Sequence, residues 1–287
     1  MKRILVTGGT GMLGTALVRE WTGRAILFPV SARHFDLRDA AAVGDAVRRL
    51  SPDWIIHTAA FTNVDGAEAS SEEAQAVNDR GTAHVAVAAA ARGASLVYVS
   101  TDYVFDGAKR TPYVETDPVG PLNVYGRTKV AGERHAAGVP SHLVVRTQGL
   151  FGREGKSFVR SILEAAAAGR AISVVNDVTT GVTYAADLAA AIRRLVEVGA
   201  TGTYHVANTG AVVWADFARA VLDEGGHPGV PVTATTAAAF ARPARRPAYS
   251  VLDTGRYAAT TGAALPSWRD ALRRCLKESA GRDASQG

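Results

Sequence analysis

The chain has 287 residues, of which 47% are hydrophobic and 21% are charged, a balance that supports a large buried core and excludes a generally disordered protein. Its one cysteine, Cys275, excludes an intramolecular disulfide framework. The formal charge of +5 suits an anionic small molecule as well as nucleic acid, and no apolar run reaches the roughly 18 residues of a membrane span. The opening MKRILVTGG enters a strand at once, so we expect no signal peptide and a cytoplasmic protein.

Short β-rich runs alternate with Ala-rich helical stretches in the first half of the chain. Strands are predicted at residues 3–7, 25–30, 54–58, 96–100 and 142–146, and helices at 11–21, 40–50, 72–92 and 125–137. Near-continuous apolar strands separated by helices indicate a parallel sheet covered on both faces. With right-handed crossovers, residues 1–150 are predicted to form a dinucleotide-binding domain of the α/β class with a doubly wound, Rossmann-type sheet.

The alternation loosens after residue 150. Helices are predicted at residues 157–168, 185–198, 214–224 and 266–277, with short strands at 172–174 and 202–206. We interpret residues 151–277 as a smaller substrate-binding lobe, interleaved with the last strands of the sheet. The polar tail at 278–287, rich in small residues, is predicted to be disordered.

A glycine-rich loop follows the first predicted strand directly and opens a helix. Its glycines, Gly8, Gly11 and Gly14, have the spacing G-x-x-G-x-x-G. Such glycines permit a tight turn, and they let backbone N–H groups at the positive end of the helix dipole bind a pyrophosphate. The residues predicted to bind a dinucleotide here are Gly8, Thr10, Gly11, Met12 and Leu13.

The end of the second predicted strand bears on the choice of cofactor. Sites that prefer NAD place an acidic residue there, where it binds the ribose 2′-hydroxyl. The first acidic residue after this strand is Asp36. Ser31 and Arg33, which come before it, suit a 2′-phosphate. NADPH is therefore the predicted cofactor and NADH the alternative, with Arg33 as an ordinary surface residue in the competing interpretation. Asp36 and Leu37 are expected to flank the adenine.

Tyr125 and Lys129 are four residues apart on a predicted helix, so their side chains share one face. An ammonium near a phenol lowers the phenol's pKa from its ordinary value of about 10, which suits proton transfer. Thr101 ends a predicted strand and would hydrogen-bond a substrate carbonyl, a role for which Ser100 competes. Thr101, Tyr125 and Lys129 are thus the predicted catalytic residues of a short-chain reductase. Tyr125 and Lys129 are also expected to contact the cofactor, Lys129 through the nicotinamide ribose.

Longer motifs surround these residues: PLNVYGRTK at 121–129, STDYVFDG at 100–107, AAFTNVD at 59–65 and VN at 77–78. Through them the chain resembles the extended short-chain dehydrogenase/reductase superfamily, and within it the dTDP-4-dehydrorhamnose reductase family of deoxysugar 4-ketoreductases. The resemblance covers nearly the whole chain. It implies that NADPH reduces the C4 ketone of a nucleotide-linked 4-keto-6-deoxyhexose, with dTDP as the expected nucleotide, and that Tyr125 protonates the new alkoxide.

The resemblance also assigns residues to the two ligands. Those along the nicotinamide channel would be Ala59, Ala60 and Thr62. Those at the sugar would be Asn63, Val64, Asp65, Asp102 and Tyr103. Arg246 matches the family's C-terminal Arg-Pro element, where a basic residue meets the substrate diphosphate.

Two segments depart from the family pattern. Where the family usually reads RTSWVYG, residues 146–152 read RTQGLFG, so Gly149 replaces a tryptophan of the sugar pocket. Where it often reads NDQYGAPT, residues 176–183 read NDVTTGVT. Both changes lie in the substrate half and leave the predicted reducing residues intact, so the sugar is left open. We predict no metal site, because the histidines lack ligand spacing and the first helix lacks the glutamate of magnesium-linked family dimers.

Two other functions compete with a deoxysugar reductase. One is a non-catalytic, NADP-binding regulatory subunit, because a related branch resembles the β subunit of methionine adenosyltransferase. The other is an epimerase or reductase that acts on a different, natural-product substrate with the same fold. The expected partner is a nucleotide sugar, with neither nucleic acid nor membrane, since the arginine cluster at 242–246 lacks interleaved aromatic residues. A monomer or homodimer is expected.

Overall fold

The computed structural model describes the backbone of residues 1–286 and the side chains of residues 1–278. Six parallel strands form its central sheet, in the order β10-β5-β4-β3-β1-β2. Their bounds are β1 Arg3–Thr7, β2 Ile26–Val30, β3 Trp54–His57, β4 Ser95–Thr101, β5 His142–Thr147 and β10 Gly202–His205. Because the chain adds β2 on one side of β1 and β3 on the other, the sheet has a switch point there, and ligands bind beyond the carboxyl ends of strands at such points.

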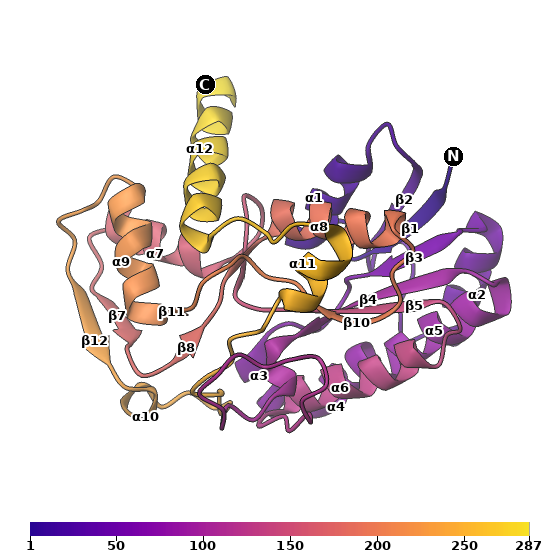
Figure 1. Ribbon diagram of the computed structural model, residues 1–287, viewed down its shortest axis with the longest axis horizontal. Helices are drawn as coiled ribbons and strands as arrows, with labels where there is room; N and C mark the ends of the chain where they lie inside the picture. The colour runs from indigo at the N-terminus through magenta and orange to yellow at the C-terminus, as the bar shows by residue number, and fades with distance from the viewer. Residues whose placement is uncertain (287) are drawn as a thin grey trace.

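Helices cover both faces of the sheet (Figure 1). Ile4 and Val6 of β1 pack on one face with α1 (Met12–Trp21) and α8 (Ala185–Glu197). Leu5, which points the other way, packs with α2 (Ala40–Leu50), α5 (Gly81–Arg92) and α6 (Val124–Ala137). Both sets of strand side chains are buried, which explains the near-continuous apolar runs. The doubly wound α/β prediction is confirmed.

The predicted helix at 72–92 is divided into three parts. It consists of α4 (Ser71–Gln75), a π-helical turn η1 (Ala76–Arg80) and α5, and a short helix α3 (Val64–Ala69) precedes it. Within η1, the buried Asn78 amide donates to the Phe61 carbonyl (3.1 Å) and to the Thr128 hydroxyl (3.0 Å). Its Oδ1 accepts from the Phe61 N–H (2.7 Å). The wide turn thus lets Asn78 join the segment at Phe61 to Thr128 of α6.

The second half of the chain builds a smaller cluster beside the carboxyl edge of the sheet (Figure 1). Its core includes Phe151, Phe217 and Trp268. Beyond α8 and β10, the elements are β6 Leu150–Phe151, α7 Phe158–Ala167, β7 Ile172–Val175, β8 Thr179–Thr180, β9 Thr183–Tyr184, β11 Val212–Val213, α9 Trp214–Glu224, β12 Val232–Thr235, α10 Ala237–Phe240, α11 Gly255–Thr261 and α12 Trp268–Gln286. A 3-10 turn, η2 (Asp102–Val104), follows β4.

The last helix, α12, is longer than the sequence predicts. It continues to Gln286, where a disordered tail is predicted over 278–287, and Gly287 lies outside the described residues. Glutamate, alanine and arginine, which are good helix formers, occur in this stretch, which continues the helix that Trp268 and Leu272 anchor in the core. None of the helices in the described part of the chain is long and apolar enough to cross a bilayer.

Candidate active site

A cavity of about 1010 Å³ lies between the carboxyl edge of the sheet and the second-half cluster. It begins at the glycine loop, passes the ends of β3 and β4, and reaches α6 and the segment around residue 247. Eighteen of the predicted site residues line it: Gly8, Thr10, Gly11, Met12, Leu13, Ser31, Asp36, Leu37, Ala59, Ala60, Thr62, Val64, Thr101, Asp102, Tyr103, Tyr125, Lys129 and Arg246. Arg33, Asn63 and Asp65 do not.

The glycine loop between β1 and α1 leaves no room for side chains. Gly8 has a φ of +69°, and a Cβ there would lie 2.8 Å from the Ala59 nitrogen. A Cβ on Gly14 would lie 2.1 Å from the Gly8 carbonyl oxygen, so the first turn of α1 packs directly on the loop. Gly11 is the N-cap, and neither a side-chain cap nor an acidic residue occupies the first turn. Its N–H groups therefore remain available to an anionic group in the cavity.

On the side of the glycine loop next to β2, Arg38 lines the cavity and Arg33 does not. A turn closed by the His34 N–H and the Ser31 carbonyl (2.9 Å) leaves Arg33 exposed and outside the lining. Arg38 lines the cavity, and its Nη2 lies 2.6 Å from the Asp36 carboxylate. This pairing lowers the pKa of Asp36 below its ordinary value. Cofactor binding by Arg33 therefore stays a prediction, and Arg38 is a second basic residue close to the end of β2.

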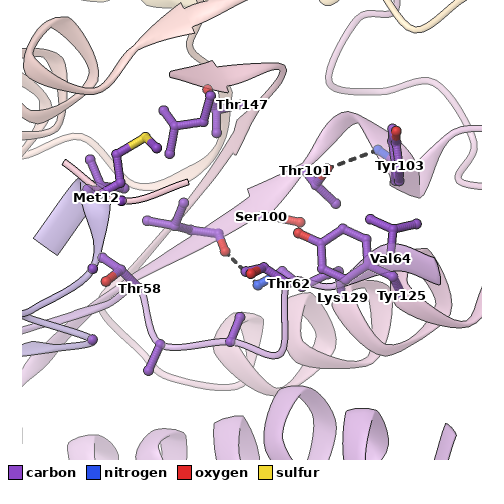
Figure 2. Close-up of a pocket in the computed structure, with 18 of the residues that line it drawn as sticks. Met12, Thr58, Thr62, Val64, Ser100, Thr101, Tyr103, Tyr125, Lys129 and Thr147 are labelled. Carbon is purple, nitrogen blue, oxygen red and sulfur yellow. Dashed lines mark hydrogen bonds between the residues drawn. The ribbon is translucent and has the colours of Figure 1, made fainter. Parts of the chain in front are cut away.

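The predicted catalytic residues meet where β4 ends and α6 begins (Figure 2). Asn123 caps α6, with its Oδ1 accepting from the Gly126 N–H (2.7 Å), and this fixes Tyr125 in the first turn. Thr101 accepts from the Tyr103 N–H (3.2 Å; Figure 2) and donates to Asp102 Oδ1 (3.0 Å). Lys129 donates from Nζ to the Val99 carbonyl (2.7 Å) and lies 4.1 Å above the Tyr98 ring centroid.

The Ser100 hydroxyl is hydrogen-bonded to a residue outside the cavity lining. It donates to Glu133 Oε1 (2.6 Å), a carboxylate outside the cavity lining. Thr101, by contrast, lies within hydrogen-bonding reach of Tyr125, and this contact opposes the rise in the tyrosine's pKa. Of the two hydroxyls that end β4, Thr101 is therefore the better placed to share a substrate oxygen with Tyr125.

Burial controls the protonation of Tyr125 and Lys129, the predicted catalytic pair. It lowers the pKa of Lys129 from 10.5 to about 7, against the opposing effect of the Glu133 carboxylate. Burial also raises the pKa of Tyr125, helped by the Asp102 carboxylate and opposed by the hydrogen bond with Thr101. Without a ligand, Tyr125 thus holds its proton at neutral pH, as a proton donor must.

A second group of polar residues faces Tyr125 across the cavity. Tyr103 packs edge-on against the Tyr125 ring, with centroids 6.0 Å apart and planes at 81°. Asp102 is buried, which raises its pKa from 3.8 to about 6, although hydrogen bonds with Ser250 and Thr101 hold the shift back. A hydroxyl-rich ligand would find both donors and acceptors here.

Two of the predicted sugar-binding residues have structural partners instead. Asn63 caps α3, with its Oδ1 accepting from the Gly66 N–H (2.9 Å). Asp65 forms a bidentate pair with Arg246, with Nη1–Oδ1 at 3.0 Å and Nη2–Oδ2 at 2.9 Å. Neither residue lines the cavity, because Asn63 serves as a helix cap and Asp65 as an ion-pair partner. Asp65 binds the guanidinium of Arg246, which the sequence assigns to a diphosphate.

Several lining residues from the second half escaped the sequence prediction. Gly149 has a φ of +50°, and a Cβ there would lie 2.6 Å from the Gly181 carbonyl oxygen. Its departure from the family motif marked part of this wall, and Gln148, Val178 and Thr180 lie in the same two divergent segments. No local motif marks the remaining lining residues, because distant segments bring them together: Lys156, Phe158, Trp214, Phe217 and Ser250.

A glycine loop at a helix N-terminus and a buried Tyr–Lys pair beside a strand-end threonine define an NAD(P)-dependent oxidoreductase of the short-chain dehydrogenase/reductase type. The family model described as RmlD substrate binding domain matches residues 1–280. The chain therefore belongs to this family, and the dTDP-4-dehydrorhamnose reductase resemblance of its motifs is confirmed.

The relatives match nearly the whole chain. It is 37% identical over 285 residues to a dTDP-4-dehydrorhamnose reductase of Sinorhizobium fredii, with 96% of each chain covered. It is 40% identical over 286 residues to a probable dTDP-4,6-dihydroxy-2-methyloxan-3-one 4-ketoreductase of Streptomyces antibioticus, with 96% of this chain and 95% of that one covered. The dTDP-4-dehydrorhamnose reductase structure from Bacillus anthracis, in complex with NADP, matches with a TM-score of 0.93 and 35% identity over 96% of this chain and 99% of that one.

Proposed function

We propose that this protein reduces the C4 ketone of a dTDP-linked 4-keto-6-deoxyhexose with NADPH, in the biosynthesis of a deoxysugar. The observation that carries the proposal is one continuous cavity with the glycine loop at one end and Tyr125, Lys129 and Thr101 further along it. Relatives named dTDP-4-dehydrorhamnose reductase, at 37–40% identity over nearly the whole chain, support the reaction and the nucleotide. The NADP complex of the Bacillus anthracis relative supports the cofactor.

The glycine loop fits a dinucleotide. A Cβ on Gly14 would meet the Gly8 carbonyl oxygen, and the uncapped first turn of α1 offers N–H groups to a pyrophosphate. Ser31 and Arg38 line the end of the cavity where an adenosine phosphate would lie. When bound, NADPH supplies the hydride.

The protein's own residues then orient the ketone and deliver the proton. Thr101 and Tyr125 would hold the C4 oxygen between two hydroxyls, which aligns the carbonyl for attack. Tyr125 gives its proton to the oxygen as negative charge develops there. The Lys129 ammonium stabilises the phenolate that remains, because an opposite charge nearby favours the ionised form.

A substrate panel tests this function. The purified protein should oxidise NADPH, measured by the loss of absorbance of the reduced nicotinamide, when given a dTDP-4-keto-6-deoxyhexose, and the sugar product should carry a hydroxyl at C4. NADH, run in parallel, tests the cofactor preference. NADPH binding with no turnover on any keto-sugar nucleotide would favour the regulatory-subunit alternative. A bound cofactor that returns to its starting redox state would favour an epimerase.

A second candidate substrate belongs in the panel. The Streptomyces antibioticus relative is named for a 4-ketoreductase of a different dTDP-sugar, and its identity to this chain is 40%. Gly149 and Val178, which line the cavity, leave a wall without the family's tryptophan. A dTDP-4-keto-2,6-dideoxyhexose should therefore be compared with the 4-keto-6-deoxyhexose by kcat/KM.

We also propose that the protein acts in the cytoplasm on a nucleotide-sugar substrate. We expect it to do so as a monomer or homodimer and without nucleic acid.

The Gly14→Ala variant should weaken NADPH binding by at least about tenfold, because its Cβ would lie 2.1 Å from the Gly8 carbonyl oxygen and force α1 away from the loop. Titration of NADPH fluorescence measures the Kd. Gly44→Ala is the matched control, because Gly44 lies within α2 and a Cβ there has nothing within 4 Å. An unchanged Kd in Gly14→Ala would mean that close packing of α1 on the glycine loop is not needed for cofactor binding.

Arg246 and Asp65 give a pair of opposite predictions for the substrate. Arg246→Gln removes a charge-assisted donor to the diphosphate and should raise KM for the nucleotide sugar by about 10- to 100-fold. Asp65→Asn weakens the competing ion pair (2.9 Å) and should lower KM by about 3- to 10-fold. The Kd for NADPH should change in neither variant. If both variants raise KM alike, the pair is structural and Arg246 does not meet the diphosphate.

A further inference from the structure

A buried ion pair lies directly behind the catalytic lysine. Glu133 is one turn after Lys129 on α6, and its carboxylate accepts from Arg146 of β5, Nε to Oε1 at 2.8 Å and Nη2 to Oε2 at 2.7 Å. The Ser100 hydroxyl adds a third hydrogen bond at 2.6 Å. Glu133 is 9% exposed and Arg146 is 6% exposed. Removing two charges from water costs several kcal/mol, so such a pair is a poor choice for stability alone.

Helix α6 and strand β4 are joined at this point by two successive contacts. Lys129 donates to the carbonyl of Val99, and Glu133 accepts from the hydroxyl of the next residue, Ser100. Neither Glu133 nor Arg146 lines the cavity, so neither can touch a bound ligand. Any effect of the pair on the reaction must pass through Lys129 or through the end of β4.

Several other titratable groups lie near Lys129, and three of them are neutral. Burial lowers the pKa of His57 on β3 to about 3 and raises that of Tyr98 on β4, so both are neutral. Tyr125 is also protonated in the free protein. Asp79 on η1 pairs with His135 on α6 (2.7 Å), away from the cavity lining, and Asp102 on η2 bonds Thr101. Glu133 is therefore the carboxylate on the lysine's own helix face, and Arg146 fixes its position.

We propose that Glu133 is a positioning residue of the reductase, and that its carboxylate, anchored by Arg146 and Ser100, favours the ammonium form of the buried Lys129. Burial alone favours the neutral amine, and a carboxylate one turn away opposes that effect. This inference rests on the proposed function, since a charged Lys129 is what stabilises the Tyr125 phenolate. The network therefore adjusts the pH range in which the catalytic pair works.

The Glu133→Gln variant tests the inference, because glutamine keeps the shape and can accept from Ser100 and Arg146 but has no charge. Reduction requires protonated Lys129, so kcat/KM falls as pH rises through the pKa of the lysine. In Glu133→Gln that fall should begin about one pH unit lower, giving about tenfold less activity at pH ~8 and near wild-type activity at pH ~5. Glu164→Gln, which removes an exposed carboxylate paired with Arg160, is the matched control.

Two further measurements separate this inference from the proposed function and from misfolding. The pH dependence of the Kd for NADPH should shift in the same direction, and it needs no turnover. A shifted binding profile in a protein that reduces no keto sugar would uphold the role of Glu133 and reject the reductase. Glu133→Asp keeps the charge and should retain the wild-type pH profile even if turnover drops. An equal loss of activity at every pH in Glu133→Gln, or a Glu133→Asp profile shifted like that of the glutamine variant, would overturn the proposal.

Discussion

Replacing Tyr125 with phenylalanine is expected to lower kcat for ketone reduction by about 10²- to 10⁴-fold, the usual contribution of a general acid. The Kd for NADPH should change by less than about twofold, because the hydroxyl contributes a proton and not the binding surface. The phenol is the one proton donor that stands beside Thr101 and shares a helix face with Lys129. Burial keeps the Tyr125 proton in place in the free protein.

Stopped-flow measurement of single-turnover NADPH oxidation is the appropriate readout, because it excludes product release. Tyr103→Phe is the matched control: its ring packs at 6.0 Å from Tyr125 in the same cavity, and it loses the same hydroxyl. We expect Tyr103→Phe to act mainly on KM, through lost contacts with the sugar. Undiminished turnover in Tyr125→Phe would transfer the proton-donor role to another hydroxyl and remove the basis for the proposed mechanism.

The sheet and its covering helices were predictable because their signal is local. Each strand of the sheet is a short apolar run, and β1 and α2 have the bounds that periodicity and capping indicate, Arg3–Thr7 and Ala40–Leu50. The interruption of the helix at 72–92 was not predictable in the same way. The π turn at η1 depends on hydrogen bonds from Asn78 to Phe61 and Thr128, the second of them 50 residues away in sequence.

In the candidate site, too, the residues in local motifs were predictable and those joined by contacts between distant segments were not. The glycine loop and the residues Thr101, Tyr125 and Lys129 lie in compact motifs whose spacing determines their geometry. Asp65 and Arg246 are 181 residues apart, so nothing in the sequence around either one announces their ion pair. The wall formed by Phe158 and Trp214 likewise comes from two helices of the second half, with ring centroids 4.7 Å apart. The motifs therefore could not predict contacts between side chains that only tertiary packing brings together.

Replacing Lys129 with methionine should abolish useful turnover and yet make the free protein more stable. Burial lowers the pKa of Lys129 from 10.5 to about 7. Below about pH 7 the lysine is charged in both the folded and the unfolded chain, so folding must bury a charge, at a cost on the order of 3–5 kcal/mol. Methionine has no charge to bury. The lost hydrogen bond from Nζ to the Val99 carbonyl, about 1 kcal/mol, offsets part of the gain.

The pH dependence distinguishes this effect from ordinary repacking. Between pH values of about 7 and 10.5 the unfolded lysine still binds a proton that the folded one has released, so wild-type stability rises with pH over this window. The methionine variant lacks that rise. Its advantage in Tm should therefore be largest at pH ~6–7 and should shrink toward pH ~10, while Lys277→Met, at an exposed lysine, should show no such trend. A constant difference in Tm across the range would mean that Lys129 is not buried as an ammonium, and the stabilisation of the Tyr125 phenolate would then need another source.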